Sequence, residues 1–189
     1  MPQGAPGHRD RNRDRVAGPA PAPAKPFRGR GRGGRRSLTA ERDSELRKRA
    51  LGLLARREHA RRELAAKLAA GGAGADGVER VLDALEAQGL LSEERFTEQF
   101  VRSRRGRGQG PARIREELRR RGIGDVAARE AVGQDDAYWA ERASQARCRR
   151  FGDAAPVDYR EWARQARFLE RRGFTTEQIR SALGPPPRR

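Results

Sequence analysis

The chain has 189 residues, of which 37% are charged and 35% hydrophobic, and its formal net charge is +17. A chain this basic is attracted to polyanions, and nucleic acid is the expected partner because binding to phosphates releases counterions. No apolar run approaches the roughly 20 residues of a membrane span, so no membrane association is expected. The single cysteine, Cys148, and the lack of a signal-peptide core predict a cytoplasmic protein without an intrachain disulfide.

Residues 1–37 differ in composition from the remainder of the chain. They are rich in Pro, Gly, Ala and Arg, and apart from Phe27 they hold almost no large apolar side chain. This composition predicts a disordered tail. The run Arg28–Arg36 is suited to follow phosphates without sequence preference, as arginine–glycine segments do. A solubilising tail without a binding role is an equally weighted alternative.

Beyond the tail, apolar residues recur at helical spacing from about Thr39 onward. The breaks between the periodic segments predict three units of three helices each, at 38–91, 92–134 and 135–184, followed by a C-terminal tail at 185–189. No segment shows sustained alternation of apolar and polar residues, so no strands are expected. The predicted fold class is all-α.

A leucine precedes a glycine by one helical turn at the end of the second helix of each unit. The pairs are Leu68 with Gly72, Leu118 with Gly122, and Leu169 with Gly173. Their nearly constant spacing, roughly 50 residues, predicts stacked copies of one supersecondary unit. Because one such unit is too small to bury its apolar face alone, the units are expected to stack into an elongated, curved array.

Helix ends and apolar stripes can be assigned within these units. Ser92 is the expected N-cap of the helix that opens the second unit, and Thr175 with Gln178 predicts a capping box. The glycine-rich stretch Gly71–Gly77 predicts a plain break between two helices. The predicted apolar stripes contain Leu46, Ala50, Leu53, Leu54, Leu64, Leu68, Val78, Val81, Leu82, Leu85, Phe96, Phe100, Val101, Ile114, Leu118, Trp139, Ala143, Ala146, Tyr159, Trp162, Ala166, Leu169, Ile179 and Leu183.

Clusters of arginine are the main functional candidates, because guanidinium groups bind phosphate oxygens in a bidentate manner. Arg104, Arg105 and Arg107 rank highest, since they flank a glycine turn without an acidic neighbour in the sequence. The alternative for each arginine is a solvated helix face balanced by a carboxylate one turn away, as with Glu58 and Arg62 or with Glu117 and Arg121. The candidates are Arg56, Arg57, Arg61, Arg62, Arg102, Arg104, Arg105, Arg107, Arg113, Arg119, Arg120, Arg121, Arg149, Arg150, Arg167, Arg171 and Arg172.

Other motifs favour structural roles. Gly106–Gly110 (GRGQG) is preceded by a helix rather than a strand and lacks a Gly-Lys-Ser/Thr end, so it is interpreted as a helix connection and not as a phosphate-binding loop. His59 and Cys148 stand alone, without the ligand spacing of a zinc site. The acidic pairs 93–94 and 135–136 stand at helix starts, where capping explains them. No catalytic residue, metal or cofactor is therefore expected.

Three segments carry a family resemblance. The sequence RQARFLERRGFTTEQI (Arg164–Ile179) resembles the C-terminal signature of RecX regulatory proteins, and Glu94–Ile123 resembles the most recognisable block of that family. Ala50–Leu68 and Val81–Leu91 fit the pattern of its first unit. The resemblance covers about residues 44–183; the tail lies outside it, and the glycine-rich connection in the first unit departs from the family pattern.

This resemblance implies tandem three-helix repeats that bind along the groove of a RecA–DNA filament. The protein is expected to be a monomer. The resemblance also implies single- and double-stranded DNA as partners, and a non-enzymatic protein that inhibits the recombinase and coprotease activities in DNA repair, recombination and the SOS response. Two alternatives stay open. One is a nucleoid-type protein that binds DNA through its basic tail. The other is a metal-dependent nuclease, for which the sequence offers no convincing set of ligands.

Overall fold

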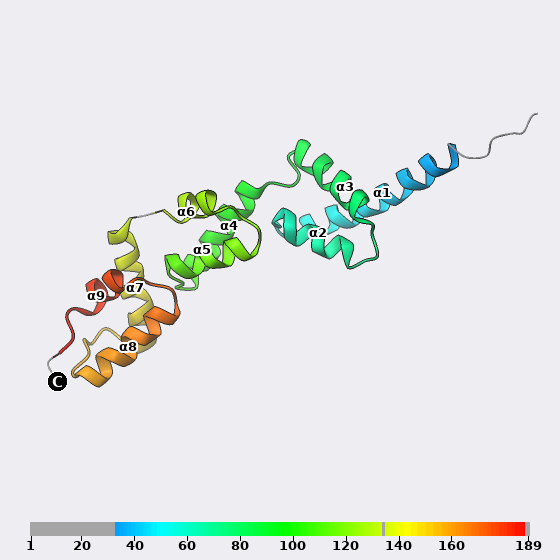
Figure 1. Cartoon of the computed structure of the whole chain (residues 1–189). Coiled ribbons are helices and arrows are strands. Elements are labelled where there is room, and N and C mark those ends of the chain that lie inside the picture. Colours follow the sequence, from blue (N-terminus) through cyan, green and yellow to red (C-terminus); the bar gives the residue numbers. More distant parts are fainter. Residues whose placement is uncertain (1–32, 134, 188–189) are drawn as a thin grey trace, which may run out of the picture.

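The computed structural model describes residues 33–133 and 135–187, and within these ranges the chain forms helices and no strand. The helices are α1 (Gly33–Leu54), α2 (Arg61–Ala69), α3 (Ala75–Ala87), α4 (Glu93–Gly106), α5 (Pro111–Arg120), α6 (Asp125–Val132), α7 (Asp136–Phe151), α8 (Tyr159–Arg171) and α9 (Thr176–Leu183). They form three groups of three in a row, so the molecule is elongated (Figure 1). The predicted all-α tandem fold is confirmed for these residues.

The predicted tail, 1–37, lies mostly outside the described residues, and α1 begins within its range, at Gly33. No helix of the described ranges has the length and apolar character needed to cross a bilayer. The same residues contain no cluster of three or more side chains suited to hold a metal ion.

The repeated leucine–glycine pairs mark equivalent helix ends. Leu68, Leu118 and Leu169 are each fully buried. The glycines that follow them have positive φ angles of 83°, 90° and 87°, which favour glycine because it has no Cβ. At the end of α5 the Ile123 N–H donates to the Leu118 carbonyl at 3.2 Å, and α8 ends with the same bond between Phe174 and Leu169. The ends of α5 and α8 therefore share one helix-ending motif, whereas at the end of α2 the Leu68 carbonyl accepts from the Gly71 N–H at 3.1 Å.

The apolar side chains form two separate cores. The first unit has its own core: Ala50, Leu64, Leu68, Val78, Val81, Leu82, Leu85 and Leu91. The second and third units share the other: Phe96, Val101, Ile114, Leu118, Ile123, Ala128, Val132, Trp139, Ala143, Ala146, Leu169, Phe174 and Ile179, together with Ala60 from the first unit. The second and third units are therefore packed as one body, and the first unit is attached to them by a smaller contact.

Several local predictions are confirmed and two are wrong. The Ser92 hydroxyl accepts a hydrogen bond from the backbone N–H of Arg95, and the capping box of Thr175 and Gln178 is present. The break at 71–77 is shorter than predicted, because Gly77 already lies in the first turn of α3. Tyr159 was expected on a buried stripe, but it is 38% exposed and stacks on Trp162 instead.

Candidate nucleic-acid interface

The candidate arginines divide into three sets by what their guanidinium groups contact. One set forms ion pairs with carboxylates: Arg57, Arg61, Arg104, Arg113, Arg119 and Arg120. A second set donates to backbone carbonyls: Arg105, Arg121, Arg149 and Arg172. A third set is exposed and makes no ion pair or side-chain hydrogen bond with any other described residue: Arg56, Arg62, Arg102, Arg107, Arg150, Arg167 and Arg171. The third set is the most available to an external anion, because its charge is not neutralised.

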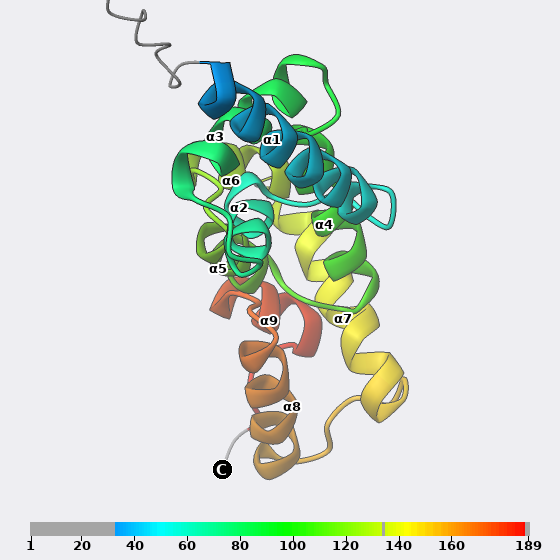
Figure 2. The same cartoon turned by 90° about the vertical axis from the view of Figure 1, so that its right-hand side faces the viewer.

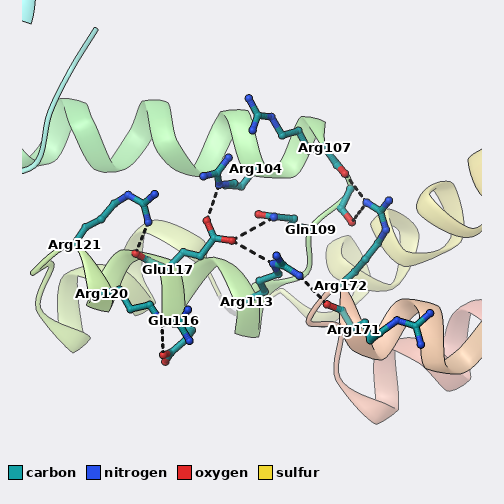
Figure 3. A network of polar contacts seen from close by, with 11 residues as sticks. Arg104, Arg107, Gln109, Arg113, Glu116, Glu117, Arg120, Arg121, Arg171 and Arg172 are labelled. Carbon is teal, nitrogen blue, oxygen red and sulfur yellow. Dashed lines mark hydrogen bonds and ion pairs between the residues drawn. The ribbon is translucent and has the colours of Figure 1, made fainter. Parts of the chain in front are cut away.

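Glu117 of α5 binds two arginines, Arg104 before the glycine turn and Arg113 after it (Figure 3). Its carboxylate accepts hydrogen bonds from Arg104 at 2.8 Å, from Arg113 at 3.2 Å and from the Gln109 amide at 3.3 Å. Burial raises the pKa of Glu117, but the hydrogen bond from Arg113 and the charge of Arg104 outweigh burial, so the pKa lies below its ordinary value. The expectation that Arg104 has no acidic partner is wrong, because the partner comes from the next helix.

The other two highly ranked arginines have different surroundings. Arg105 donates to the Val132 carbonyl at 2.7 Å, and its guanidinium lies over the rings of Tyr138 and Trp139. Arg105 therefore joins α4 to α6 and α7 rather than pointing to solvent. Arg107 is exposed, and its guanidinium remains available for an external anion.

The turn Gly106–Gly110 packs against the loop at residues 172–173 and so joins the second unit to the third. This contact between the two loops is called the seam below. The Gly110 N–H donates to the Arg172 carbonyl at 2.7 Å, and the Ala112 N–H donates to the Gly173 carbonyl at 3.0 Å. From the other side, the Arg172 guanidinium donates to the Arg107 carbonyl at 2.6 Å (Figure 3). The interpretation of this turn as a helix connection is confirmed. Its backbone N–H groups are used within the protein and not for a phosphate.

The expected pairs one turn apart on a helix are not formed. Glu58 accepts a hydrogen bond at 2.8 Å from Arg95, at the junction of the first and second units, and not from Arg62. Arg121 donates to the backbone carbonyl of Glu117 and not to its carboxylate. Glu58 instead binds Arg95 of α4, and Glu117 binds Arg104 of α4 as well as Arg113 of its own helix, so both carboxylates link segments that are distant in the chain.

A polar cluster around a buried histidine, His59, joins the segment before α2 to the first turns of that helix. His59 is 1% exposed; its Nδ1 lies 2.9 Å from the Arg57 carbonyl and its Nε2 lies 2.9 Å from the Lys67 ammonium. Nδ1 must therefore donate, and Nε2 must accept, which is the neutral tautomer. Burial lowers the pKa of His59, and the charges of Arg57 and Lys67 lower it further, against the hydrogen bond to the carbonyl. The neighbouring Glu63 has its pKa lowered to about 2: burial raises it, but the hydrogen bonds from Arg57 and Lys67 dominate.

We expect the first unit to lose stability as the pH falls below the ordinary histidine pKa of about 6.5. The folded-state pKa of His59 is lowered, so between the two pKa values the unfolded chain binds more protons and acid favours unfolding. Thermal unfolding followed by circular dichroism between pH 7.5 and pH 5 measures the effect. His59→Asn, which keeps a donor for the Arg57 carbonyl, should flatten this dependence; an equal slope in the variant would contradict the assignment.

An arginine stripe on α8 was incompletely recognised in the sequence. Arg160, Arg164, Arg167 and Arg171 are all exposed, and their spacing of four, three and four residues places them along one face of the helix. Over the roughly 16 Å between its ends, the stripe has one described ion-pair partner, Glu161, which binds Arg164 at 3.2 Å. Only Arg167 and Arg171 were among the predicted residues. The helical spacing of the other two is the signal that would have found them.

The fold and the surface define a basic, all-α protein of tandem three-helix units. Family models match each unit in order: the first three-helix domain of RecX at residues 47–85, the second at 92–132 and the third at 136–183. The chain therefore belongs to the RecX family of regulatory proteins, and the resemblance seen in its motifs is confirmed.

Relatives and solved structures agree with this assignment. The chain is 54% identical over 137 residues to the regulatory protein RecX of Halorhodospira halophila, covering 72% of this chain and 85% of the relative. It is 48% identical to that of Chromohalobacter salexigens, covering 71% and 88%. The crystal structure of RecX from Lactobacillus salivarius matches the fold with a TM-score of 0.64 at 22% identity, over 76% of this chain and 95% of that one. The family is one of regulatory proteins, and it implies RecA as the target.

Proposed function

We propose that this protein binds along the RecA–DNA filament as a monomer in the cytoplasm and restrains the recombinase and coprotease activities of RecA. Family membership supports RecA as the target. The observation that carries the DNA part of the proposal is the set of exposed arginines without carboxylate partners, which includes Arg167 and Arg171 of the α8 stripe. Such groups attract phosphate, and they bind it with less internal competition than the paired arginines.

The elongated shape supports contact with several filament subunits at once. The three units extend in a row (Figure 1), so a bound molecule would distribute modest contacts over its length. Contacts linked in this way bind more tightly than any one of them, because release requires all of them to detach together. A regulator of this kind would resist displacement from the filament without a deep binding pocket.

The proposal predicts a specific result with RecA. At fixed salt, stoichiometric addition of the protein should lower the rate of RecA-driven ATP hydrolysis on single-stranded DNA and slow strand exchange. A form lacking residues 1–32 should retain most of this effect, because the exposed arginines of the helical units remain. If neither rate nor filament length changes, the proposal is wrong. If the truncated form loses DNA binding and inhibition together, the alternative of a tail-driven, nucleoid-type protein is favoured instead.

A further inference from the structure

A small basic cleft lies between the end of α7 and one face of α8. Arg150 and Phe151 from α7 and Arg164, Phe168 and Arg171 from α8 line a volume of about 420 Å³. The two helices pack against each other and lie side by side at the end of the molecule (Figures 1 and 2). The cleft includes two members of the α8 stripe, and one of them, Arg171, meets the network around Glu117 through its backbone carbonyl, which accepts from Arg113 at 3.1 Å.

Two of the three cleft arginines, Arg150 and Arg164, lie over an aromatic ring of the cleft, and Arg172 beside the cleft lies over the other ring. Phe151 and Phe168 meet edge to face, with ring centroids 5.2 Å apart. The guanidinium groups of Arg150 and Arg164 lie 5.5 Å and 5.4 Å from the Phe151 centroid, and that of Arg172 lies 4.6 Å from the Phe168 centroid. A guanidinium held over a ring keeps its N–H groups available to an acceptor at the edge. Because arginines already cover these rings, a nucleic-acid base has little ring face on which to stack.

The cleft carries an excess of positive charge. Arg164 is bound to Glu161, whereas Arg150 and Arg171 have no carboxylate partner among the described residues. Like charges that converge on one cleft repel each other, and a bound anion relieves this repulsion. The remaining partner-free N–H groups are donors suited to an oxyanion.

We propose that this cleft binds a backbone phosphate of single-stranded DNA. Converging guanidinium groups fit the several oxygens of a phosphate, and the α8 stripe continues the cationic surface from the cleft toward Arg160. The occupied ring faces favour the phosphate over a base, so binding is independent of sequence. This inference deepens the proposed function, on which it rests for its biological setting, and it names the residues that hold the strand.

The test uses the full chain and a short fluorescein-labelled oligothymidylate, without RecA, and measures the dissociation constant by anisotropy over a range of salt concentrations. Arg150→Gln with Arg171→Gln should weaken binding about tenfold and lower the salt slope by roughly 1, because single-strand phosphate contacts are lost. The matched control is Arg42→Gln with Arg180→Gln, which removes equal charge from exposed arginines outside the cleft. The control should weaken binding about threefold or less.

A conservative variant separates geometry from charge. Arg150→Lys with Arg171→Lys keeps the charge and loses the bidentate fork, so its affinity should lie between those of the parent and the glutamine variant. The proposal would be overturned if the glutamine variant and the matched control lost the same affinity for the oligothymidylate. Full affinity in the lysine variant would also overturn it. So would intact DNA binding with loss of binding to a poly-glutamate peptide, which would make the cleft a site for acidic protein segments. Because RecA is absent, these outcomes are independent of the test of RecA inhibition.

Discussion

Gly110→Ala is expected to destabilise the joined second and third units by about 2–4 kcal/mol, which lowers their melting temperature by roughly 10 °C or more. A Cβ at this position would lie 2.4 Å from the Gly173 carbonyl carbon and 2.5 Å from the Phe174 nitrogen. These are backbone atoms, so they cannot move aside as the end of a flexible side chain would. The two loops must separate, and the hydrogen bonds from Gly110 and Ala112 across the seam are lost or lengthened.

Gly106→Ala is the matched control for the seam. Gly106 lies at the end of α4, four residues before Gly110, and no atom lies within 4 Å of a Cβ built there. Alanine is the better helix former by about 1 kcal/mol, so this variant should be neutral or more stable. Thermal unfolding, combined with amide exchange at Ala112, measures both effects. Equal stability of the two variants would show that the seam does not couple the units.

The glycines of these units differ in how far their roles can be predicted from the sequence. Helix ends were predictable at Gly122 and Gly173, because a glycine after the last apolar residue is a local signal. The role of Gly110 was not, because the atoms that exclude a side chain there belong to a loop more than sixty residues away in the chain. The sequence shows a glycine-rich turn, and only the packed units show why the glycine is needed.

The candidate arginines likewise include contacts that the sequence cannot predict and a pattern that it can. Arg104 was ranked as unpaired because the residues beside it in sequence carry no acid, yet Glu117 binds it from the facing helix. Ion pairs between helices depend on packing geometry, which composition and spacing do not contain. The α8 stripe is the opposite case, because Arg160 and Arg164 lie at helical spacing from Arg167 and need no tertiary information to find.

Leu118→Ala is expected to destabilise only the body formed by the second and third units, by about 2–5 kcal/mol. Leu118 is fully buried in the core that these units share, while the first unit has a core of its own. Cores that share few contacts unfold with separate free energies. Calorimetry should therefore resolve two unfolding transitions. Leu118→Ala should lower the melting temperature of the transition that belongs to the second and third units.

Leu68→Ala supplies the matched control, because Leu68 is the equivalent residue of the first unit and is likewise fully buried. Leu68→Ala should lower the melting temperature of the first unit and leave that of the second and third units unchanged. Fluorescence identifies the transitions, because Trp139 belongs to the shared core and the first unit contains no tryptophan. If both variants lower one common transition, then Ala60 and the Arg95–Glu58 ion pair couple the units strongly, and the array behaves as one cooperative body.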